Sequence, residues 1–387
     1  MILVKEHNMA SLRDSIDQKI AHSGFISLHD YMDIALYHPM LGYYRRDKVI
    51  GEAGDFITAP EISQMFGELT GLWLAHQCQS QHLESKAALV ELGPGRGTLM
   101  ADLLRAWRQT SLDFPSVYMM ETSPSLTQTQ KEALSHITET TIQWHQSVDA
   151  LPDQPLLIIA NEFFDALPVR QFQRTDSGWQ EHGITSGENG WQMIWKAVPS
   201  ENVPDFVKDM ASPSPDISSK TDISVMSYAP ALPSIIASLS ARITAHGGAM
   251  LIIDYGKADA FGDTVQAVYQ HKPVDILTRP GETDLTAWVD FSHISAVAIA
   301  NGLTATPLQP QGSFLKSIGI MERAEQLAAN GTPELRRRLL AELDRLVNPS
   351  QMGQAFKVMA LLPAQIGDSK SVTPTTIPGW PTQPLTA

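Results

Sequence analysis

The sequence predicts an α/β fold with a mostly parallel central sheet. Short apolar runs at 87–91, 117–121, 141–144, 156–160 and 249–254 have the length of buried strands. Segments with helical character, 98–108, about 125–135 and about 233–246, separate several of these runs. Strands that alternate with helices form βαβ units, whose strands run parallel. Because the strands are apolar throughout, we expect helices on both faces of the sheet.

Residues 1–80 precede this pattern and are predicted to form a helical N-terminal segment that contributes to the substrate site. Leu12, Ile16 and Ile20 recur at helical spacing and predict one helix over 9–36. A second helix is predicted from Glu61 to about Cys78. Proline and glycine between 39 and 54 indicate loops that separate the two helices.

The core is predicted over 81–366, with an insertion at about 169–226. Residues 169–197 carry three tryptophans and glycine-rich turns, and are interpreted as an antiparallel β-hairpin beside the sheet. The stretch 199–224 is rich in proline, serine and aspartate, which predicts a mobile loop. A helix at 292–301, helices near 321–347 and a strand at 356–362 complete the core. The tail 367–387 has four prolines and no periodicity, and is predicted to be disordered.

Composition excludes several classes of protein. The 387 residues include 42 acidic and 28 basic side chains, a net charge of −14, which disfavours a nucleic-acid partner because few counterions could be released. The single cysteine, Cys78, excludes an intrachain disulfide and a cysteine-rich metal site, and fits a reducing compartment. We see no signal peptide and no apolar run near the ~20 residues of a membrane span. A cytoplasmic protein without a metal is expected.

The strongest local motif is Leu89-Val-Glu-Leu-Gly-Pro-Gly-Arg-Gly-Thr98, a strand that turns into a helix through Gly93, Gly95 and Gly97. Glycines in such a turn let a nucleotide-like ligand approach the backbone closely. Glu121 ends the next strand, where a carboxylate can accept hydrogen bonds from both ribose hydroxyls of an adenosine. A glycine turn alone is weak evidence, since tight strand–helix turns often contain two glycines, but the acid at the second strand end strengthens it.

Glu91 decides between two adenosine cofactors. It ends the first strand, so its carboxylate would repel the pyrophosphate of NAD, whereas it can accept hydrogen bonds from an ammonium group. S-adenosyl-L-methionine carries a sulfonium and an α-ammonium and no phosphate. The E-x-G-x-G-x-G order therefore favours a methyltransferase over a nicotinamide enzyme.

A second group of polar residues follows the strand at 156–160. Asn161, Glu162 and Asp165 lie where substrate meets cofactor in such sheets, and Asp254 ends a further strand at the same edge. Each has a plainer alternative. Asn161 can cap a helix that buries the following phenylalanines, and Asp254 can cap a turn.

These motifs resemble the MidA family of methyltransferases. The resemblance rests on the glycine loop and on 42–44 (GYY), 54–68 (GDFITAPEISQMFGE), 161–168 (NEFFDALP) and 254–256 (DYG), and spans about residues 24 to 363. Further matches are 280–281, 284–286, 289–291, 314–316 and 352–353.

The resemblance implies a Rossmann-like class I methyltransferase that uses S-adenosyl-L-methionine and methylates an arginine of a respiratory complex I subunit. It matches Gly93, Gly95 and Gly97 to the cofactor loop, Glu121 to the ribose acid and Asn161-Glu162 to the motif after the fourth strand. Similar eukaryotic proteins work in the mitochondrial matrix. The stretch Ser227-Tyr-Ala-Pro230 departs from the family pattern, because it lacks a glutamate before the proline step. The loss puts the usual target in question.

An arginine nucleophile is protonated and delocalised, so a pair of carboxylates is needed to orient it and to localise its charge. We take Glu162 and Asp165, with Asn161, as the candidate catalytic residues. The candidate substrate-binding residues are Tyr43, Tyr44, Asp55, Glu61 and Asp254. Asp55 as a turn acid, Glu61 at a helix N-terminus and the tyrosines as packing residues are the plainer alternatives.

Two other functions stay open at this point. A catalytically idle assembly factor could keep the fold and bind a complex I subunit, and a small-molecule or nicotinamide enzyme could use the same sheet. The intact glycine loop with Glu121 counts against the first, and Glu91 against a nicotinamide enzyme. The sequence leaves a monomer and a homodimer equally open.

Overall fold

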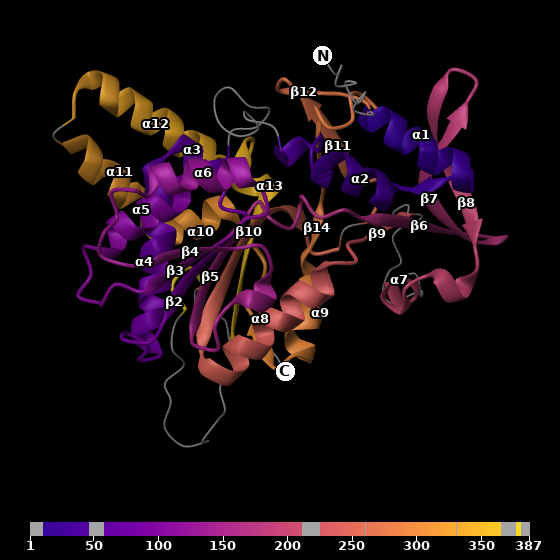
Figure 1. Cartoon of the computed structure of the whole chain (residues 1–387). Helices are drawn as coiled ribbons and strands as arrows, with labels where there is room; N and C mark the ends of the chain where they lie inside the picture. Colours follow the sequence, from indigo (N-terminus) through magenta and orange to yellow (C-terminus); the bar gives the residue numbers. More distant parts are fainter. Residues whose placement is uncertain are drawn as a thin grey trace, which may run out of the picture.

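The computed structural model (Figure 1) describes residues 11–45, 58–210, 225–259, 261–329, 331–364 and 377–380. Its central sheet has the order β15-β17-β10-β5-β2-β3-β4. The predicted parallel strands are present as β2 (Ala88–Leu92), β3 (Ser116–Met120), β4 (Ile142–His145), β5 (Leu156–Asn161) and β10 (Gly248–Lys257). At one edge, β17 (Phe356–Pro363) pairs antiparallel with β10, and β15 (Leu303–Ala305) pairs antiparallel with β17. The chain reverses its direction of winding between β2 and β5, which is where such sheets bind ligands.

Helices cover both faces of this sheet, as the apolar strands predict. Alternate residues of a strand point to opposite faces. Leu89 and Leu157 pack in a cluster with α4 (Gln64–Ser80), α5 (Thr98–Trp107), α10 (Gln311–Ser317), α11 (Ile320–Ala329) and α12 (Pro333–Val347). Val90 and Ile158 pack in a second cluster with α8 (Leu232–His246) and α9 (Phe291–Ala300). Figure 1 shows α8 and α9 on one side of the sheet and α4 and α5 on the other. A further helix, α6 (Pro124–Ala133), follows β3.

The prediction of one helix over 9–36 is wrong. The structure has α1 (Leu12–Ser23), a short strand β1 (Ile26–Ser27) and α2 (Leu28–Tyr37). Gly24 ends α1 in the left-handed conformation (φ 71°), and Ser27 caps α2 by accepting a hydrogen bond from the Asp30 N–H at 3.0 Å. The turn η1 (Tyr43–Arg45) follows, and α3 (Ala59–Ile62) precedes α4.

The insertion is larger than a hairpin. It contains β6 (Arg170–Thr175), β7 (Gly178–Gly187) and β8 (Gly190–Val198), which form an antiparallel sheet with β9 (Val225–Tyr228) and β1. The pairing of β1 with β7 joins the N-terminal segment to this insertion, and a two-residue strand carries too little pattern to be predicted. Part of the predicted mobile loop is regular: η3 (Ser200–Asn202) and α7 (Asp205–Met210). Residues 211–224 lie outside the described residues.

A smaller sheet next to α2 has the order β12-β11-β13. Its strands are β11 (Val265–Tyr269), β12 (Lys272–Pro273) and β13 (Asp284–Ala287). Short strands β14 (Val289–Asp290) and β16 (Gln309–Pro310) pair with β10 and β17, and α13 (Met352–Ala355) leads into β17. Tyr31 of α2 ties the smaller sheet to the N-terminal segment, since its hydroxyl donates to the Ile276 carbonyl at 2.6 Å.

The predicted disorder of the tail does not hold for residues 377–380. Trp380 is buried against Trp73 and Phe314. The indole of Trp73 donates to the Pro378 carbonyl at 2.9 Å, and that of Trp380 donates to the Pro307 carbonyl at 2.7 Å. A single tryptophan in a proline-rich stretch supplies the apolar area that fixes these residues. Among the described residues, no helix is both long and apolar enough to span a membrane.

Candidate active site

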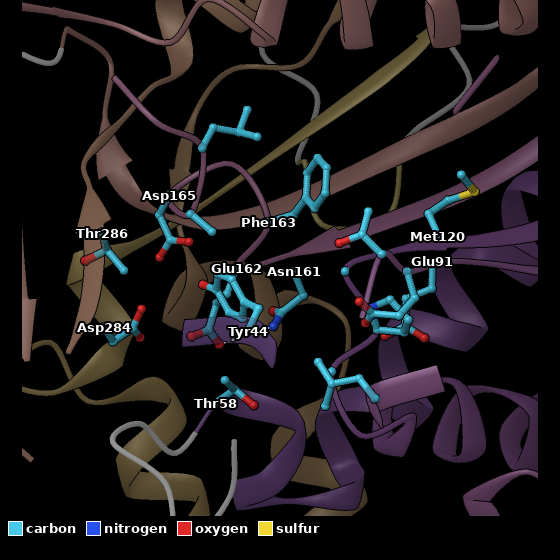
Figure 2. A pocket seen from close by; sticks show the side chains of 18 of the residues that line it. Tyr44, Thr58, Glu91, Met120, Asn161, Glu162, Phe163, Asp165, Asp284 and Thr286 are labelled. Atoms are coloured by element: carbon cyan, nitrogen blue, oxygen red, sulfur yellow. Dashed lines mark hydrogen bonds between the residues drawn. The ribbon is translucent and has the colours of Figure 1, made fainter. Parts of the chain in front are cut away.

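A cavity of about 560 Å³ opens at the carboxyl ends of β2, β3 and β5 (Figure 2), within the usual size range of small-molecule sites. Ten of the residues singled out in the sequence line it: Tyr43, Tyr44, Glu61, Glu91, Gly93, Gly95, Glu121, Asn161, Glu162 and Asp165. Gly97 and Asp254 do not line it. Asp55 lies outside the described residues. The structure thus brings most of the predicted cofactor-binding residues and most of the predicted catalytic and substrate-binding residues to one cavity.

The glycine loop has the backbone that its sequence predicts. Gly93, Gly95 and Gly97 have φ of 63°, 52° and 86°, which is the left-handed region that side chains disfavour. A Cβ on Gly93 would lie 3.0 Å from Cδ2 of Phe163, and one on Gly97 would lie 3.4 Å from Cα of Gln130. Gly97 also caps α5, so the loop leads directly into a helix N-terminus. At Gly93 and Gly95 the loop therefore presents backbone without a side chain to the cavity.

Gln130 fixes Glu121 relative to the glycine loop. Its amide Nε2 donates to Glu121 Oε2 at 3.0 Å and to the Gly95 carbonyl at 2.8 Å, while its Oε1 accepts from the indole of Trp144 at 2.9 Å. The Ser123 N–H donates to Glu121 Oε1 at 2.7 Å. Burial raises the pKa of Glu121 above its usual value, and these donors act in the opposite direction. The sequence does not reveal Gln130, because it lies on α6 with no motif around it.

Two buried acceptors facing the cavity have no hydrogen-bond donor among the described residues. Glu91 is 3% exposed and its Oε2 is unpaired, and Asn161 is 8% exposed with Oδ1 unpaired. Buried polar atoms are nearly always hydrogen-bonded in proteins, so both atoms fit a ligand that brings N–H or O–H donors. Burial, followed by the nearby charge of Glu121, raises the pKa of Glu91 well above its usual value. A cationic ammonium would stabilise the ionised form of this carboxylate.

Glu162 is the first of the acidic residues that line the cavity after β5. It is one of the non-glycine residues with positive φ (53°), a conformation that costs free energy and is often found at functional sites. Its Oε1 accepts from the Ala59 N–H and from Asn161 Nδ2, both at 3.2 Å. Enclosure by protein raises its pKa. The contact with Ala59 brings the start of α3, in the N-terminal segment, to the end of β5.

Asp165 lies further along the same loop and is buried. Its pKa is raised well above the usual range, first by burial and then by the charges of Asp254, Glu162 and Asp284. Figure 2 shows Asp165 and Asp284 pointing toward each other, with Glu162 and Asn161 between this pair and Glu91. The acidic residues therefore form one end of the cavity, and the glycine loop with Glu91 forms the other.

Asp254 lies outside the cavity lining. It is fully buried, and its carboxylate accepts hydrogen bonds from the Phe164 N–H at 2.9 Å and the Tyr255 N–H at 2.8 Å. These bonds hold the loop that carries Asp165 against β10. The turn-capping alternative describes this geometry, and contact with substrate stays a prediction.

The buried Asp254 gives a pH dependence that can be measured. Burial raises its pKa to about 7, so between its unfolded value near 4 and 7 the folded protein keeps a proton that the unfolded chain releases. Folding therefore becomes less favourable as pH rises through this window. We expect the free energy of unfolding of the ligand-free protein to fall between pH 5 and 7, and Asp254→Asn to make this decline shallower, by up to about 1.4 kcal/mol per pH unit.

Urea unfolding at several pH values measures this slope. Asp259→Asn removes an exposed aspartate, and should leave the wild-type slope unchanged. Equal slopes for wild type and Asp254→Asn would contradict the assignment.

The N-terminal segment supplies one wall of the cavity. The rings of Tyr37 and Tyr44 lie 5.4 Å apart between centroids, and the Tyr37 hydroxyl donates to the Ala166 carbonyl at 2.9 Å. Glu61 accepts a hydrogen bond of 2.5 Å from Thr98 Oγ1, at the start of α5. Both Tyr43 and Tyr44 line the cavity, and their role in substrate binding stays a prediction.

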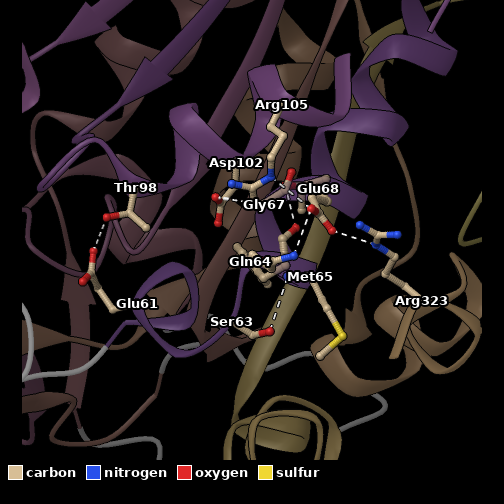
Figure 3. A network of polar contacts seen from close by, with 12 residues as sticks. Glu61, Ser63, Gln64, Met65, Gly67, Glu68, Thr98, Asp102, Arg105 and Arg323 are labelled. Carbon is tan, nitrogen blue, oxygen red and sulfur yellow. Dashed lines mark hydrogen bonds and ion pairs between the residues drawn. The ribbon is translucent and has the colours of Figure 1, made fainter. Parts of the chain in front are cut away.

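A network of charged residues behind this wall holds α4 against the core (Figure 3). Buried Glu68 of α4 accepts from Arg105 of α5 at 3.2 Å and from Arg323 of α11 at 2.8 Å. Arg105 also pairs with Asp102 at 2.6 Å. A Cβ on Gly67 would lie 2.6 Å from Cβ of Asp102, so the two helices pack closely. The network positions the helix that follows Glu61 and Ala59.

Sequence reasoning missed several residues of the cavity. Tyr37, Thr98, Asp284 and Thr286 line it, and Gln130 supports it. Asp284 and Thr286 belong to a motif that matches the family pattern, and this match is the one feature of the sequence that could have indicated them as site residues. Tyr37 ends a helix and Gln130 lies within one, so neither could be distinguished from an ordinary helical residue.

The comparisons with known proteins agree with this geometry. The model of a family described as S-adenosyl-L-methionine-dependent methyltransferases matches residues 69–309. The relative named protein arginine methyltransferase NDUFAF7, mitochondrial, from Danio rerio is 36% identical over 383 residues, covering 91% of this chain and 87% of that protein. The protein of the same name from Homo sapiens is 35% identical over 378 residues, covering 90% and 82%.

Solved structures support the fold. A protein from Burkholderia thailandensis, crystallised with S-adenosyl-homocysteine, superposes with a TM-score of 0.78 at 24% identity, over 91% of each chain. A second crystal structure from that organism gives a TM-score of 0.76 at 25% identity over 91% of each chain. The fold and the site define a class I methyltransferase that uses S-adenosyl-L-methionine. The chain belongs to the MidA family, to which the resemblance of its motifs pointed.

Proposed function

We propose that this enzyme transfers a methyl group from S-adenosyl-L-methionine to an arginine side chain of a protein. The observation that carries the proposal is the position of Glu162 and Asp165 in the same cavity as the glycine loop. An acidic pocket beside a cofactor loop suits a cationic acceptor. The relatives named above, which are called protein arginine methyltransferases, support the same acceptor.

The residues of the chain divide the work. Bound S-adenosyl-L-methionine supplies a methyl group activated by the sulfonium. Glu162 and Asp165 would bind two edges of the guanidinium, which turns one nitrogen toward the methyl carbon and draws the positive charge to the others. Transfer would join that nitrogen to the methyl carbon and break the carbon–sulfur bond, and one of the two carboxylates would take the proton of the nitrogen and release it to water. The raised pKa of Glu162 suits it to accept this proton.

For the protein substrate, the family resemblance suggests a subunit of respiratory complex I. The departure at Ser227 bears on this target. Ser227 is buried, and its hydroxyl lies 2.6 Å from that of Thr264 and accepts from Gln171 Nε2 at 3.3 Å. It does not line the cavity, which supports an acceptor pocket that does not depend on this departure. We place the reaction in the bacterial cytoplasm, whereas the named relatives are mitochondrial proteins.

Transfer of a labelled methyl group tests the proposal. The purified enzyme, labelled S-adenosyl-L-methionine and an extract from a strain lacking the gene should give one labelled protein band, whose hydrolysate contains methylated arginine. Excess S-adenosyl-homocysteine should suppress the label. Label in nucleic acid or small molecules would contradict the proposal, and cofactor binding without transfer to any protein would favour the idle assembly factor.

A further inference from the structure

The cavity contains a carboxylate that neither the strand ends nor the family resemblance assigned to the reaction. Asp284 begins β13, and Thr286, two residues on, lines the same cavity. Side chains two apart in a strand share a face, and Leu285 between them is buried in the N-terminal cluster on the other face. Asp284 is only 8% exposed, so its carboxylate lies inside the site and not on its rim.

The smaller sheet is fixed to the loop that carries the other acids. The Ala287 N–H of β13 donates to the Asp165 carbonyl at 2.8 Å. The Tyr37 hydroxyl donates to the carbonyl of the next residue, Ala166, at 2.9 Å. The first bond holds β13 against the loop that follows β5, and the second holds the end of α2 against the same loop. Figure 2 shows the carboxylates of Asp165 and Asp284 turned toward each other.

We propose that Asp284 is a specificity-determining residue that, together with Asp165, binds the guanidinium of the substrate and selects it over an ammonium. This inference rests on the proposed function. A guanidinium is a planar group with five N–H donors, which can bridge two carboxylates that approach from different directions. An ammonium is a compact point charge that gains less from such an arrangement and retains its water more strongly.

A second feature of the cavity points to a ligand with N–H donors. Asn161 Oδ1, buried and without a donor among the described residues, lies in the same lining as the two aspartates. Tyr44, whose ring lies 5.4 Å from that of Tyr37, adds an aromatic wall beside them. The tyrosine rings and the carboxylates together suit a flat cation, because aromatic faces also attract cations.

Binding of two small probes tests the role of Asp284. Calorimetry with N-acetyl-arginine methylamide and N-acetyl-lysine methylamide, each in the presence of saturating S-adenosyl-homocysteine, should show the arginine probe binding at least 10-fold more tightly to the wild type. Asp284→Asn should weaken the arginine probe by about 10-fold, change the lysine probe little, and leave the affinity for S-adenosyl-homocysteine within about 2-fold. Asp284→Ser provides the same comparison if the asparagine variant does not fold.

Asp275→Asn is the matched control, because it removes an exposed aspartate from the loop between β12 and β13 with the same change of charge. It should behave as the wild type. An arginine-to-lysine ratio unchanged by Asp284→Asn, or a wild type without preference for the arginine probe, would overturn the role of Asp284. The proposed function is judged separately, since arginine labelling of a protein by the wild type can succeed while the ratio stays unchanged.

Discussion

Glu162→Gln is expected to lower the rate of methyl transfer at saturating substrate by at least about 100-fold, the size of effect seen when one group that stabilises transition-state charge is removed. Glu162 Oε1 already accepts from the Ala59 N–H and Asn161 Nδ2. The glutamine carbonyl can replace Oε1 in these two bonds. Its NH₂ group would then occupy the place of Oε2, which turns a donor toward a cationic substrate that brings only donors.

Affinity for S-adenosyl-homocysteine should stay within a few-fold of the wild type, because the predicted cofactor residues are unchanged. Calorimetry and single-turnover transfer separate the two effects. Glu132→Gln makes the same change on the exposed face of α6 and should leave both quantities unaltered. Turnover near the wild-type rate in Glu162→Gln would exclude an essential role for this carboxylate.

The parallel strands of the core could be predicted because each carries its own apolar signal. Residues 88–92 and 156–161 are buried on both faces, so their sequences are apolar except for Glu91 and Asn161 near their carboxyl ends. The helix break at Gly24 was missed, because the apolar spacing of α1 continues through α2 and hides a glycine in the left-handed conformation. The extra strand β8 was missed because three tryptophans and two glycine turns fit a hairpin equally well.

The residues of the site also fall into some that the sequence could predict and some that it could not. Residues that follow strand ends could be found from the sequence, because a parallel sheet brings the ends of its strands to one edge. Asp284 comes from a separate sheet and Gln130 from the side of a helix, so their positions depend on tertiary contacts that no local pattern contains. Asp254 is predicted to bind substrate or to cap a turn, and the structure shows its carboxylate bound to two backbone N–H groups, while contact with substrate stays a prediction.

The acidic residues of the cavity also explain why a net charge of −14 says little by itself. Glu91 and Glu121 are at one end, and Glu162, Asp165 and Asp284 at the other. Burial and mutual repulsion raise the pKa of Glu91 and Asp165 well above their usual values. Ligands that carry a sulfonium and a guanidinium would offset this repulsion. We therefore expect bound cofactor to favour the ionised form of the carboxylates around the substrate, and bound substrate to favour the ionised form of those around the cofactor.

Glu121→Ala is expected to weaken binding of S-adenosyl-homocysteine by about 100-fold. Hydrogen bonds to a charged group contribute about 1.5–3 kcal/mol each, and a ribose would lose two. The Ser123 N–H and Gln130 Nε2 would also lose their acceptor, and Gln130 would remain bonded to the Gly95 carbonyl. Calorimetry measures the affinity, with Glu132→Ala as the exposed control.

The kinetics of Glu121→Ala should differ in kind from those of Glu162→Gln. Glu121 lies at the glycine-loop end of the cavity, so its loss should raise the KM for S-adenosyl-L-methionine and leave kcat within about 10-fold once the cofactor saturates the enzyme. Glu162→Gln should lower kcat with little change in that KM. If Glu121→Ala instead lowered kcat and left cofactor affinity intact, the carboxylate would act on the reacting groups and the division of the cavity into a cofactor end and an acceptor end would be wrong.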